Sequence, residues 1–337
     1  MSSIPTTMRA VQLLAYDGRA ESIVVAQIPV PRAGPGEVLV RMAAAPVNPS
    51  DITFTRGLYG VKKSLPTIAG FEGSGTVVES GGGMMARFLK GRRVACHAAD
   101  RSITGGTWAE YLLTPAHACV PLRKQVDMEQ GATMLVNPFT AWALVEEARR
   151  GGHGAVVQTA AASAVGRMML RLARKFSIPV INVVRRTEQV ELLHSMGAEH
   201  VLNSSEAEFD AKLRELCQQL KASFGLDAVA GEMTARVLRA QPKGSRMLVY
   251  GALSLAPSQV DPGSLIFEGK RVEGFWLSGW LRHRNMLTRL RVARHVQELL
   301  ATELKTEFQA RFPLEEAARA LQQYAANMTA GKVLLVP

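Results

Sequence analysis

The chain has few cysteines, and none of them lies near another in the sequence. Only Cys96, Cys119 and Cys217 occur in 337 residues, at intervals that match neither a zinc-binding pair nor a redox CxxC motif. Small secreted domains without a large core depend on dense cysteine frameworks, so this class is excluded. We therefore expect a protein of the reducing cytoplasm.

Long apolar runs are also missing. No stretch approaches the roughly 18 consecutive apolar residues that cross a bilayer. The first residues, MSSIPTTMRAVQLL, lack the basic flank and apolar core of a secretory signal, and they lack the arginine content of an organelle transit peptide. The sequence therefore predicts a cytoplasmic protein without membrane association.

Acidic side chains are scarce relative to basic ones. The chain has 29 Asp and Glu against 40 Lys and Arg, which gives a net charge of +11. Much of the excess lies in residues 279–295, where no interleaved aromatic side chains suggest base stacking. The charge favours an anionic partner or a phosphorylated cofactor. A basic surface kept for solubility is the alternative.

The residues that are present predict two domains of different texture. Short apolar alternations such as AVQLLAY, EVLVRMAA and RRVACHA fill the first third and favour a β-rich, barrel-like domain. From about Met128 helical and strand patterns alternate, beginning with a helical pattern over residues 128–148. This order is typical of an α/β fold with a doubly wound parallel sheet. Residues 313–337 are expected to return to the first domain.

A turn of small residues joins a predicted strand to a predicted helix in GAVVQTAAASAVGRMML. In a doubly wound sheet this turn is where a dinucleotide pyrophosphate meets the free amides of a helix N-terminus. Gly166 is the only glycine within the turn, and Ser163 is placed to cap the helix. An ordinary tight strand–helix turn is the alternative.

Two arginines follow the next predicted strand, VINVV. Arg185 and Arg186 stand about 20 residues after the small-residue turn, and no acid precedes Glu188. At this strand end NAD-specific proteins place a carboxylate, whereas arginine pairs with the 2′-phosphate of NADP. We expect NADPH as the cofactor, with both arginines on its 2′-phosphate. Two solvated arginines opening a helix are the alternative.

Several stretches together resemble a known family. They run from about Pro46 to the C-terminus and include APVNPSDITFTRGLYG, LVNPFTAWALV, INVVRR, SLIFEGKRVEGFWLSGW and GKVLLVP. They resemble the zinc-free branch of the medium-chain dehydrogenase/reductase superfamily, above all the mitochondrial-type 2-enoyl thioester reductases, and next the quinone oxidoreductases. The resemblance implies a GroES-like catalytic domain over residues 1–125 and 300–337, and a Rossmann NADPH-binding domain over residues 126–299.

The resemblance also indicates that the protein binds no metal. Zinc-dependent members carry a cysteine and a histidine where this chain has NPSDI and AGFEGSG, with Phe71 at the histidine position. Phenylalanine cannot ligate zinc, and catalytic zinc needs three protein ligands. His97, beside Cys96, is expected to be a strand-end residue.

A tyrosine is expected to act in place of the metal. Tyr59, in RGLYG, aligns with the proton-donating tyrosine of the thioester reductases, and Gly57 and Gly60 flank it. A phenol stays protonated at neutral pH and can still donate a proton or a hydrogen bond. A packed loop tyrosine is the alternative.

The resemblance implies a further set of cofactor contacts. The family's phosphate loop has an asparagine and a glycine where this chain has Ala162 and Ala164. Trp276 is equally compatible with a place in the core. The expected cofactor-binding residues are Asn137, Thr140, Ser163, Ala164, Val165, Arg185, Arg186, Tyr250, Gly251, Ala252, Leu253, Phe275, Trp276, Leu277, Ser278 and Lys332.

The function implied by these features is NADPH-dependent reduction of a 2-enoyl thioester in fatty acid metabolism. The thioester would be carried by coenzyme A or by an acyl-carrier protein, both anionic. A quinone or enone reductase of the same superfamily is the first alternative. A basic RNA-binding protein on the same fold, without turnover, is the second. A homodimer joined through the sheet edge near RVEGFWL is expected by analogy.

Overall fold

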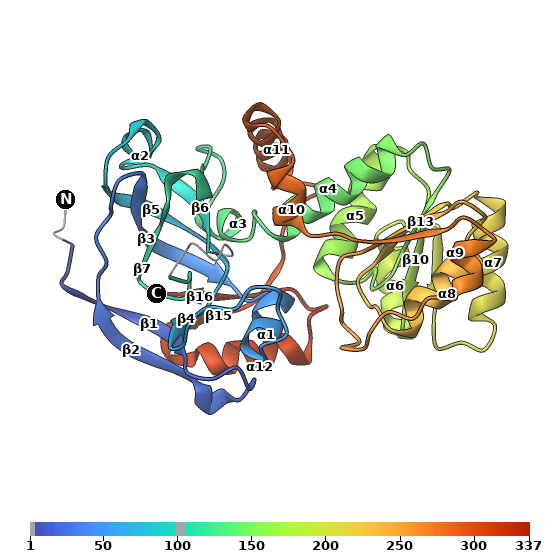
Figure 1. Ribbon diagram of the computed structural model, residues 1–337, viewed down its shortest axis with the longest axis horizontal. Coiled ribbons are helices and arrows are strands. Elements are labelled where there is room, and N and C mark those ends of the chain that lie inside the picture. The colour runs from blue at the N-terminus through green and yellow to red at the C-terminus, as the bar shows by residue number, and fades with distance from the viewer. Residues whose placement is uncertain (1–3, 99–104) are drawn as a thin grey trace. The chain divides into compact units, whose positions relative to one another are not determined.

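The computed structural model describes residues 4–98 and 105–337, which form two compact units (Figure 1). Unit 1 comprises Met1–Asn137 and Ala293–Pro337, and unit 2 comprises Pro138–Val292. The C-terminal segment thus returns to the N-terminal unit. The domain boundaries expected at residues 125 and 300 differ from these positions by 12 and 7 residues.

The described residues of unit 1 form two sheets. The smaller has the strand order β2 (Ile23–Pro29), β1 (Thr7–Leu13), β4 (Thr67–Ile68). The larger has the order β15 (Phe308–Pro313), β16 (Lys332–Val336), β3 (Glu37–Pro46), β5 (Glu72–Ser80), β6 (Arg93–His97), β8 (Cys119–Pro121), and β7 (Tyr111–Pro115) pairs with β3. Its helices are α1 (Pro49–Thr55), α2 (Met84–Leu89), α3 (Met128–Ala132) and α12 (Ala317–Ala326).

The core of the larger sheet follows from alternation along its strands. Val38, Val40 and Met42 of β3 turn the same face inward and pack with buried residues of β5 and β6. Cys96 of β6 lies opposite Cys119 of β8 within this cluster. Both are free thiols, and burial raises the pKa of Cys119 to about 12.

Unit 2 contains a six-stranded parallel sheet. The strand order is β11 (His200–Asn203), β10 (Val180–Val184), β9 (Val156–Gln158), β12 (Phe224–Asp227), β13 (Arg246–Val249), β14 (Arg271–Gly274). Counted along the chain within this unit, the order is 3-2-1-4-5-6, the doubly wound arrangement expected from the sequence. The direction of winding reverses between β9 and β12. Ligands bind such sheets at the carboxyl ends of the strands beside this reversal.

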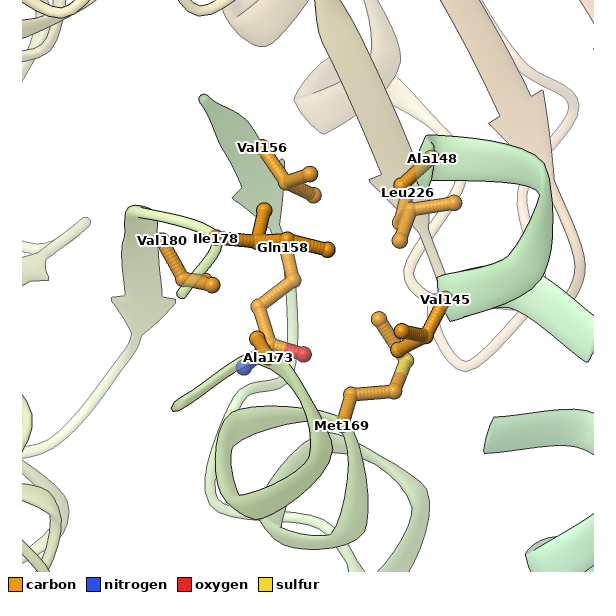
Figure 2. A pocket seen from close by; sticks show the side chains of 9 residues that line it. All are labelled: Val145, Ala148, Val156, Gln158, Met169, Ala173, Ile178, Val180 and Leu226. Carbon is orange, nitrogen blue, oxygen red and sulfur yellow. The ribbon is translucent and has the colours of Figure 1, made fainter. Parts of the chain in front are cut away.

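Helices cover both faces of this sheet (Figure 1). On one face, α7 (Phe209–Gln219) and α8 (Glu232–Ala240) pack on inward residues of β9 and β10. On the other, α4 (Asn137–Arg150) and α5 (Ala164–Lys175) enclose a small apolar pocket with β9, β10 and β12 (Figure 2). The remaining helices are α6 (Thr187–Ser195), α9 (Pro262–Ile266), α10 (Leu277–Arg282) and α11 (Met286–Leu299).

One polar side chain enters the apolar layer shown in Figure 2. Gln158 of β9 is fully buried and directs its amide toward α5. Its Nε2 donates to Asn182 Oδ1 of β10 at 2.6 Å and to the carbonyl oxygen of Gly166 in α5 at 3.2 Å. These bonds tie the first two strands to the helix that follows the small-residue turn.

The helix expected over residues 128–148 is interrupted, so that expectation was wrong in this detail. Helix α3 ends at Ala132 and α4 begins at Asn137. Between them, the amides of Leu135 and Val136 each donate to Glu72 Oε2 at 2.9 Å. An amide that donates to a buried carboxylate cannot also donate to a carbonyl one helical turn back. The interruption therefore follows from Glu72.

No helix in residues 4–98 and 105–337 combines the length and apolar character needed to cross a membrane. The cytoplasmic location expected from the sequence stays a prediction.

The first testable prediction concerns Gly166. A Cβ at this position would lie well inside van der Waals contact with the backbone of Ala161, so Gly166→Ala must push α5 away from the turn. We expect a loss of roughly 1–3 kcal/mol in the free energy of unfolding, measured by urea titration. Gly274→Ala is the matched control in the same unit, because a Cβ there meets nothing within 4 Å. Equal stability of the two variants would contradict the prediction.

Candidate functional site

The turn after β9 has the geometry of an anion-binding strand–helix junction. Ser163 is the N-cap of α5, and its Oγ accepts a hydrogen bond from the amide of Gly166 at 3.1 Å. Ala160 adopts a left-handed backbone conformation, with φ of 49°. The lack of side chains larger than methyl at positions 160–162 leaves the backbone approachable. Ser163, Ala164 and Val165 thus lie at the N-terminus of α5, and their contact with the pyrophosphate stays a prediction.

A buried aspartate joins this turn to the strand on the other side of the winding reversal. Asp227, at the end of β12, is fully buried. Its Oδ1 accepts from the hydroxyl of Thr159 at 2.7 Å and from the amides of Val229 and Ala230 at 2.9 and 3.2 Å. Its Oδ2 accepts from the hydroxyl of Thr234 at 2.6 Å. The carboxylate therefore fixes the loops after β9 and β12 together.

The next strand end along the sheet carries Tyr250. Its phenol is buried and has no hydrogen-bond partner within the described residues. Burial, and then the charge of Asp227, raise the pKa of Tyr250 well above its ordinary value, so the phenol remains a donor at any physiological pH. A buried donor left without a protein acceptor is suited to a ligand oxygen.

The residues after Tyr250 and after β14 border the same edge of the sheet. A Cβ on Gly251 would press on the carbonyl oxygen of Ala228 at 2.7 Å, so glycine permits this close approach. The amide of Phe275 continues the β13–β14 pairing by donating to the carbonyl of Val249. Trp276 is 45% exposed, with the Arg282 guanidinium over its ring. Trp276 is therefore not a core residue of its unit.

The two arginines stand at the end of β10, as expected. Both side chains are exposed. Arg186 is the N-cap residue of α6, and its Nε lies 3.0 Å from Glu188 Oε1. The backbone of Arg185 is held on both sides, since its amide donates to Gln189 and its carbonyl accepts from the hydroxyl of Ser205. No acid occurs between Phe176 and Thr187, so nothing there favours a ribose hydroxyl over a phosphate.

In unit 1, Tyr59 follows α1 on a loop. Its half-buried ring packs on Phe71, with ring centroids 4.8 Å apart. Phe71 is 2% exposed and belongs to a small aromatic cluster with Phe54 and Leu13. Phe71, which the family resemblance aligns with a zinc-ligating histidine, is thus the residue on which Tyr59 packs.

The Tyr59 loop is braced at both ends. Gly57 has φ of 69°, and a Cβ there would meet the Tyr16 side chain at 3.0 Å. The Tyr16 hydroxyl accepts from the amide of Lys63 and donates to its carbonyl. Lys63 Nζ in turn donates to the carbonyls of Ala98 and Gly105. These contacts hold the chain on either side of Tyr59.

Lys332 lies inside unit 1 and is fully buried. Its ammonium donates to the carbonyl of Val47 at 3.1 Å, to Asn48 Oδ1, and to the hydroxyl of Tyr324 at 3.1 Å. All three N–H groups of the ammonium are therefore held by the protein. Asn137, the other expected contact in this unit, is 5% exposed and begins α4, while Thr140 lies one turn further along that helix.

Two buried carboxyl groups, of Asp51 and Glu72, accept hydrogen bonds from Asn48. Asp51, in the first turn of α1, accepts from the Asn48 amide at 2.7 Å, and Glu72 accepts from Asn48 Nδ2 at 2.9 Å. Burial raises the pKa of each carboxyl group to about 7, opposed by their hydrogen bonds and by the charge of Lys332. Neither this cluster nor Asp227 was predicted from the sequence. An acid inside an otherwise apolar, glycine-rich strand such as FEGSGTVV was the available signal.

Within residues 4–98 and 105–337, no group of three or more His, Cys, Asp or Glu side chains is arranged to hold a metal ion. His97 is the last residue of β6. The expectation that the protein binds no zinc stays a prediction.

A second testable prediction concerns Asp51. Its pKa of about 7 in the folded chain exceeds the value of roughly 3.9 in an unfolded chain. The folded chain therefore binds a proton more tightly, and this stabilisation is complete below about pH 4 and is lost as the pH rises to about 7. Asp51→Asn removes the effect.

We expect the stability of Asp51→Asn relative to the parent protein to rise by about 3 kcal/mol between pH 4.5 and pH 8. Urea unfolding at a series of pH values measures this difference. A difference that does not change with pH would contradict the assignment.

The chain is similar to known proteins over most of its length. Residues 34–124 match the family model described as an alcohol dehydrogenase GroES-like domain, and residues 164–291 match the model described as a zinc-binding dehydrogenase. The mitochondrial enoyl-[acyl-carrier-protein] reductase of Xenopus tropicalis is 29% identical over 98% of this chain and 97% of its own length.

Solved structures give the same result. A Mesorhizobium loti protein, provisionally described as an NADPH:quinone reductase, is 36% identical with a TM-score of 0.90, and all of each chain is covered. A mycobacterial structure complexed with NADPH is 25% identical with a TM-score of 0.83, over 98% of this chain and 100% of that one. The chain is therefore an oxidoreductase that belongs to the medium-chain dehydrogenase/reductase superfamily.

Proposed function

We propose that the protein reduces the double bond of a 2-enoyl thioester with NADPH, using Tyr59 as the proton donor and no zinc. The observation that carries the proposal is the packing of Tyr59 on Phe71 in a braced, glycine-flanked loop. A phenol thus occupies the region where metal-dependent relatives of the family pattern need a zinc ligand. The Xenopus tropicalis relative named above acts, by its name, on an enoyl-acyl-carrier-protein.

NADPH is the cofactor. The mycobacterial structure of the same fold contains it. The residues of this chain suit a phosphorylated dinucleotide: Ser163 begins a helix behind an approachable backbone turn, and Tyr250 offers an unused buried donor. At the end of β10, Arg185 and Arg186 would pair with the 2′-phosphate through charge-assisted hydrogen bonds. These residues would orient the cofactor along the carboxyl edge of the sheet.

The chemistry requires one hydride and one proton. NADPH held by these residues would supply the hydride that adds to the β-carbon of the enoyl group, leaving NADP⁺. The electron pair of the double bond then lies on the α-carbon and the thioester oxygen, and Tyr59 donates a proton to the α-carbon. The product is the saturated thioester, and Tyr59 regains its proton from water.

A quinone or enone reductase is the second candidate. It is favoured by the identity of 36% over the full length of the Mesorhizobium loti protein, whose provisional name is NADPH:quinone reductase. The hydride chemistry is the same, and the acceptor differs. The RNA-binding alternative is not favoured, because the relatives described above carry reductase names or contain NADPH.

The thioester carrier would be anionic, whether coenzyme A or an acyl-carrier protein. The chain offers a basic surface for it in α10 and α11, where Arg282, Arg291 and Arg294 are exposed. Between Glu273 and Glu298 the sequence has no acid. Opposite charges accelerate encounter more than they strengthen the final complex.

A homodimer would be formed through β14. This strand lies at the end of the six-stranded sheet and pairs only with β13 among the described strands. Ile266 and Phe267, just before it, are 70% and 81% exposed. An edge strand without a partner can pair with the same strand of a second copy about a twofold axis.

Sedimentation tests the dimer. The parent protein should sediment as a dimer, and Phe267→Asp should shift the equilibrium toward the monomer. A monomeric parent protein would refute the dimer.

A third testable prediction concerns Tyr59. We expect Tyr59→Phe to lower kcat with crotonyl-CoA by roughly 10²-fold or more, because the proton donor is lost. The Kd for NADPH, measured by fluorescence, should not change. Tyr111→Phe is the matched control, a partly buried tyrosine on β7 of the same unit, and it should retain turnover. Unaltered turnover in Tyr59→Phe would refute the role.

The same assay separates the two candidate acceptors. NADPH oxidation is followed with crotonyl-CoA, with longer enoyl-CoA substrates and with a simple quinone. A kcat/KM for enoyl-CoA at least tenfold above that for the quinone supports the thioester. The reverse order would establish the quinone reductase.

A fourth testable prediction concerns cofactor choice. Replacing Arg185 and Arg186 together by alanine should weaken NADPH binding by roughly 10²-fold, since charge-assisted hydrogen bonds to the phosphate are lost. NADH binding should stay as it is. Arg214→Ala, an exposed arginine on α7 of the same unit, controls for the loss of surface charge. Equal loss of affinity for NADPH and NADH would contradict the assignment.

A further inference from the structure

We propose that Glu72 is a positioning residue for NADPH binding. Its carboxylate holds the backbone of Leu135 and Val136 and thereby fixes Asn137, one of the residues expected to bind the cofactor. Glu72 opens β5 and is fully buried. The proposal rests on the assignment of Asn137 as a cofactor contact and not on the identity of the substrate.

The contact lies where the chain leaves unit 1. Glu72 Oε2 accepts from the amides of Leu135 and Val136, each at 2.9 Å. Asn137 comes next, is the last residue of unit 1 and the first of α4, and Pro138 begins unit 2. Two consecutive amides on one oxygen leave this peptide segment little freedom to rotate. The orientation from which Asn137 projects is therefore set by a carboxylate 65 positions earlier in the sequence.

The carboxylate is itself oriented by a chain of donors. Lys332 donates to Asn48 Oδ1, and Asn48 Nδ2 donates to Glu72 Oε1 at 2.9 Å. Because an ammonium can only donate, it determines which way the Asn48 amide faces. Asn48 in turn presents its NH₂ group to Glu72. The buried lysine thus acts on Asn137 through Asn48, Glu72 and the backbone of residues 135–136.

Every group that is hydrogen-bonded to Glu72 is a donor, so these bonds require the ionised carboxylate. A proton on Oε1 would face Asn48 Nδ2, and a proton on Oε2 would face two amides. The ionisable groups near the carboxylate are Lys332, the carboxyl group of Asp51 and the thiol of Cys96. Burial raises the pKa of Glu72 to about 7. Protonation below that pH should therefore release the Leu135–Val136 segment and weaken cofactor binding.

A neighbouring residue separates this role from ordinary stabilisation. Ser74 lies two positions further along β5, on the same face, and is also fully buried. Its hydroxyl donates to the carbonyl of Met128 at 2.6 Å, at the beginning of α3. Ser74→Ala removes a buried hydrogen bond from the same strand without contact to Leu135 or Val136.

The experiment compares Glu72→Gln with Ser74→Ala. Glutamine has the shape of glutamate, but its NH₂ group must face either Asn48 Nδ2 or the two amides. We expect Glu72→Gln to weaken NADPH binding about tenfold at pH 8, measured by fluorescence titration without any substrate. Ser74→Ala should bind NADPH as the parent protein does. Parent-like affinity in Glu72→Gln, or equal weakening in both variants, would overturn the proposal.

The pH dependence gives a second readout. The affinity of the parent protein for NADPH should fall about tenfold between pH 8 and pH 6, and that of Glu72→Gln should fall clearly less. The 2′-phosphate of NADPH also titrates near pH 6, and the variant corrects for it because it retains both arginines. The same pH profile for both proteins would overturn the proposal.

If Glu72→Gln does not fold, the proposal can be tested on the parent protein alone. The hydrogen-exchange rates of the Leu135 and Val136 amides, divided by their intrinsic rates, should increase about tenfold from pH 8 to pH 6. If the protection of these two amides does not change with pH, Glu72 does not hold them through its ionised carboxylate. Because none of these measurements involves turnover, failure to reduce crotonyl-CoA would count against the proposed substrate and not against this role.

Discussion

A carboxylate buried away from water must be surrounded by hydrogen-bond donors, and each unit of this protein is organised around such a group. An unpaired buried charge costs several kcal/mol in real proteins, so the backbone near it is held to the geometry that supplies donors. Asp227 gathers two hydroxyls and two amides and joins the loops on both sides of the winding reversal. Glu72 gathers one side-chain amide and two backbone amides at the exit from unit 1. The loops that carry the proposed cofactor contacts are therefore held in shape by buried carboxylates.

Local patterns were sufficient to predict the architecture. The run VINVV is β10, buried at all five positions, and the arginines follow it as expected. The small-residue turn lies between β9 and α5, with Ser163 as the helix cap. Strand and helix periodicity depends on neighbours within a few residues, which is why these features could be derived from the sequence alone. The position of Tyr59 on its loop came from the family resemblance rather than from periodicity.

The features that could not be predicted depend on partners far apart in the sequence. The break between α3 and α4 is caused by Glu72, more than 60 residues earlier, and nothing in the pattern of residues 128–148 indicates it. The burial of Lys332 depends on Val47 and Asn48, at the opposite end of the chain. The exposure of Trp276 is likewise decided by packing and not by residue type. Periodicity indicates which face of a helix or strand is apolar. It does not indicate which distant carboxylate will accept hydrogen bonds from the backbone amides of that element.

The burial of the cysteines determines how fast the folded protein reacts with thiol reagents. Cys96 and Cys119 become neighbours across β6 and β8 inside the first core. With the pKa of Cys119 raised to about 12, on the order of one molecule in 10⁵ carries a thiolate there at pH 7. Since the thiolate is the reactive form, alkylation or oxidation has to await a transient separation of these strands. The labelling rate of this thiol therefore reports how often the edge of the barrel-like sheet opens.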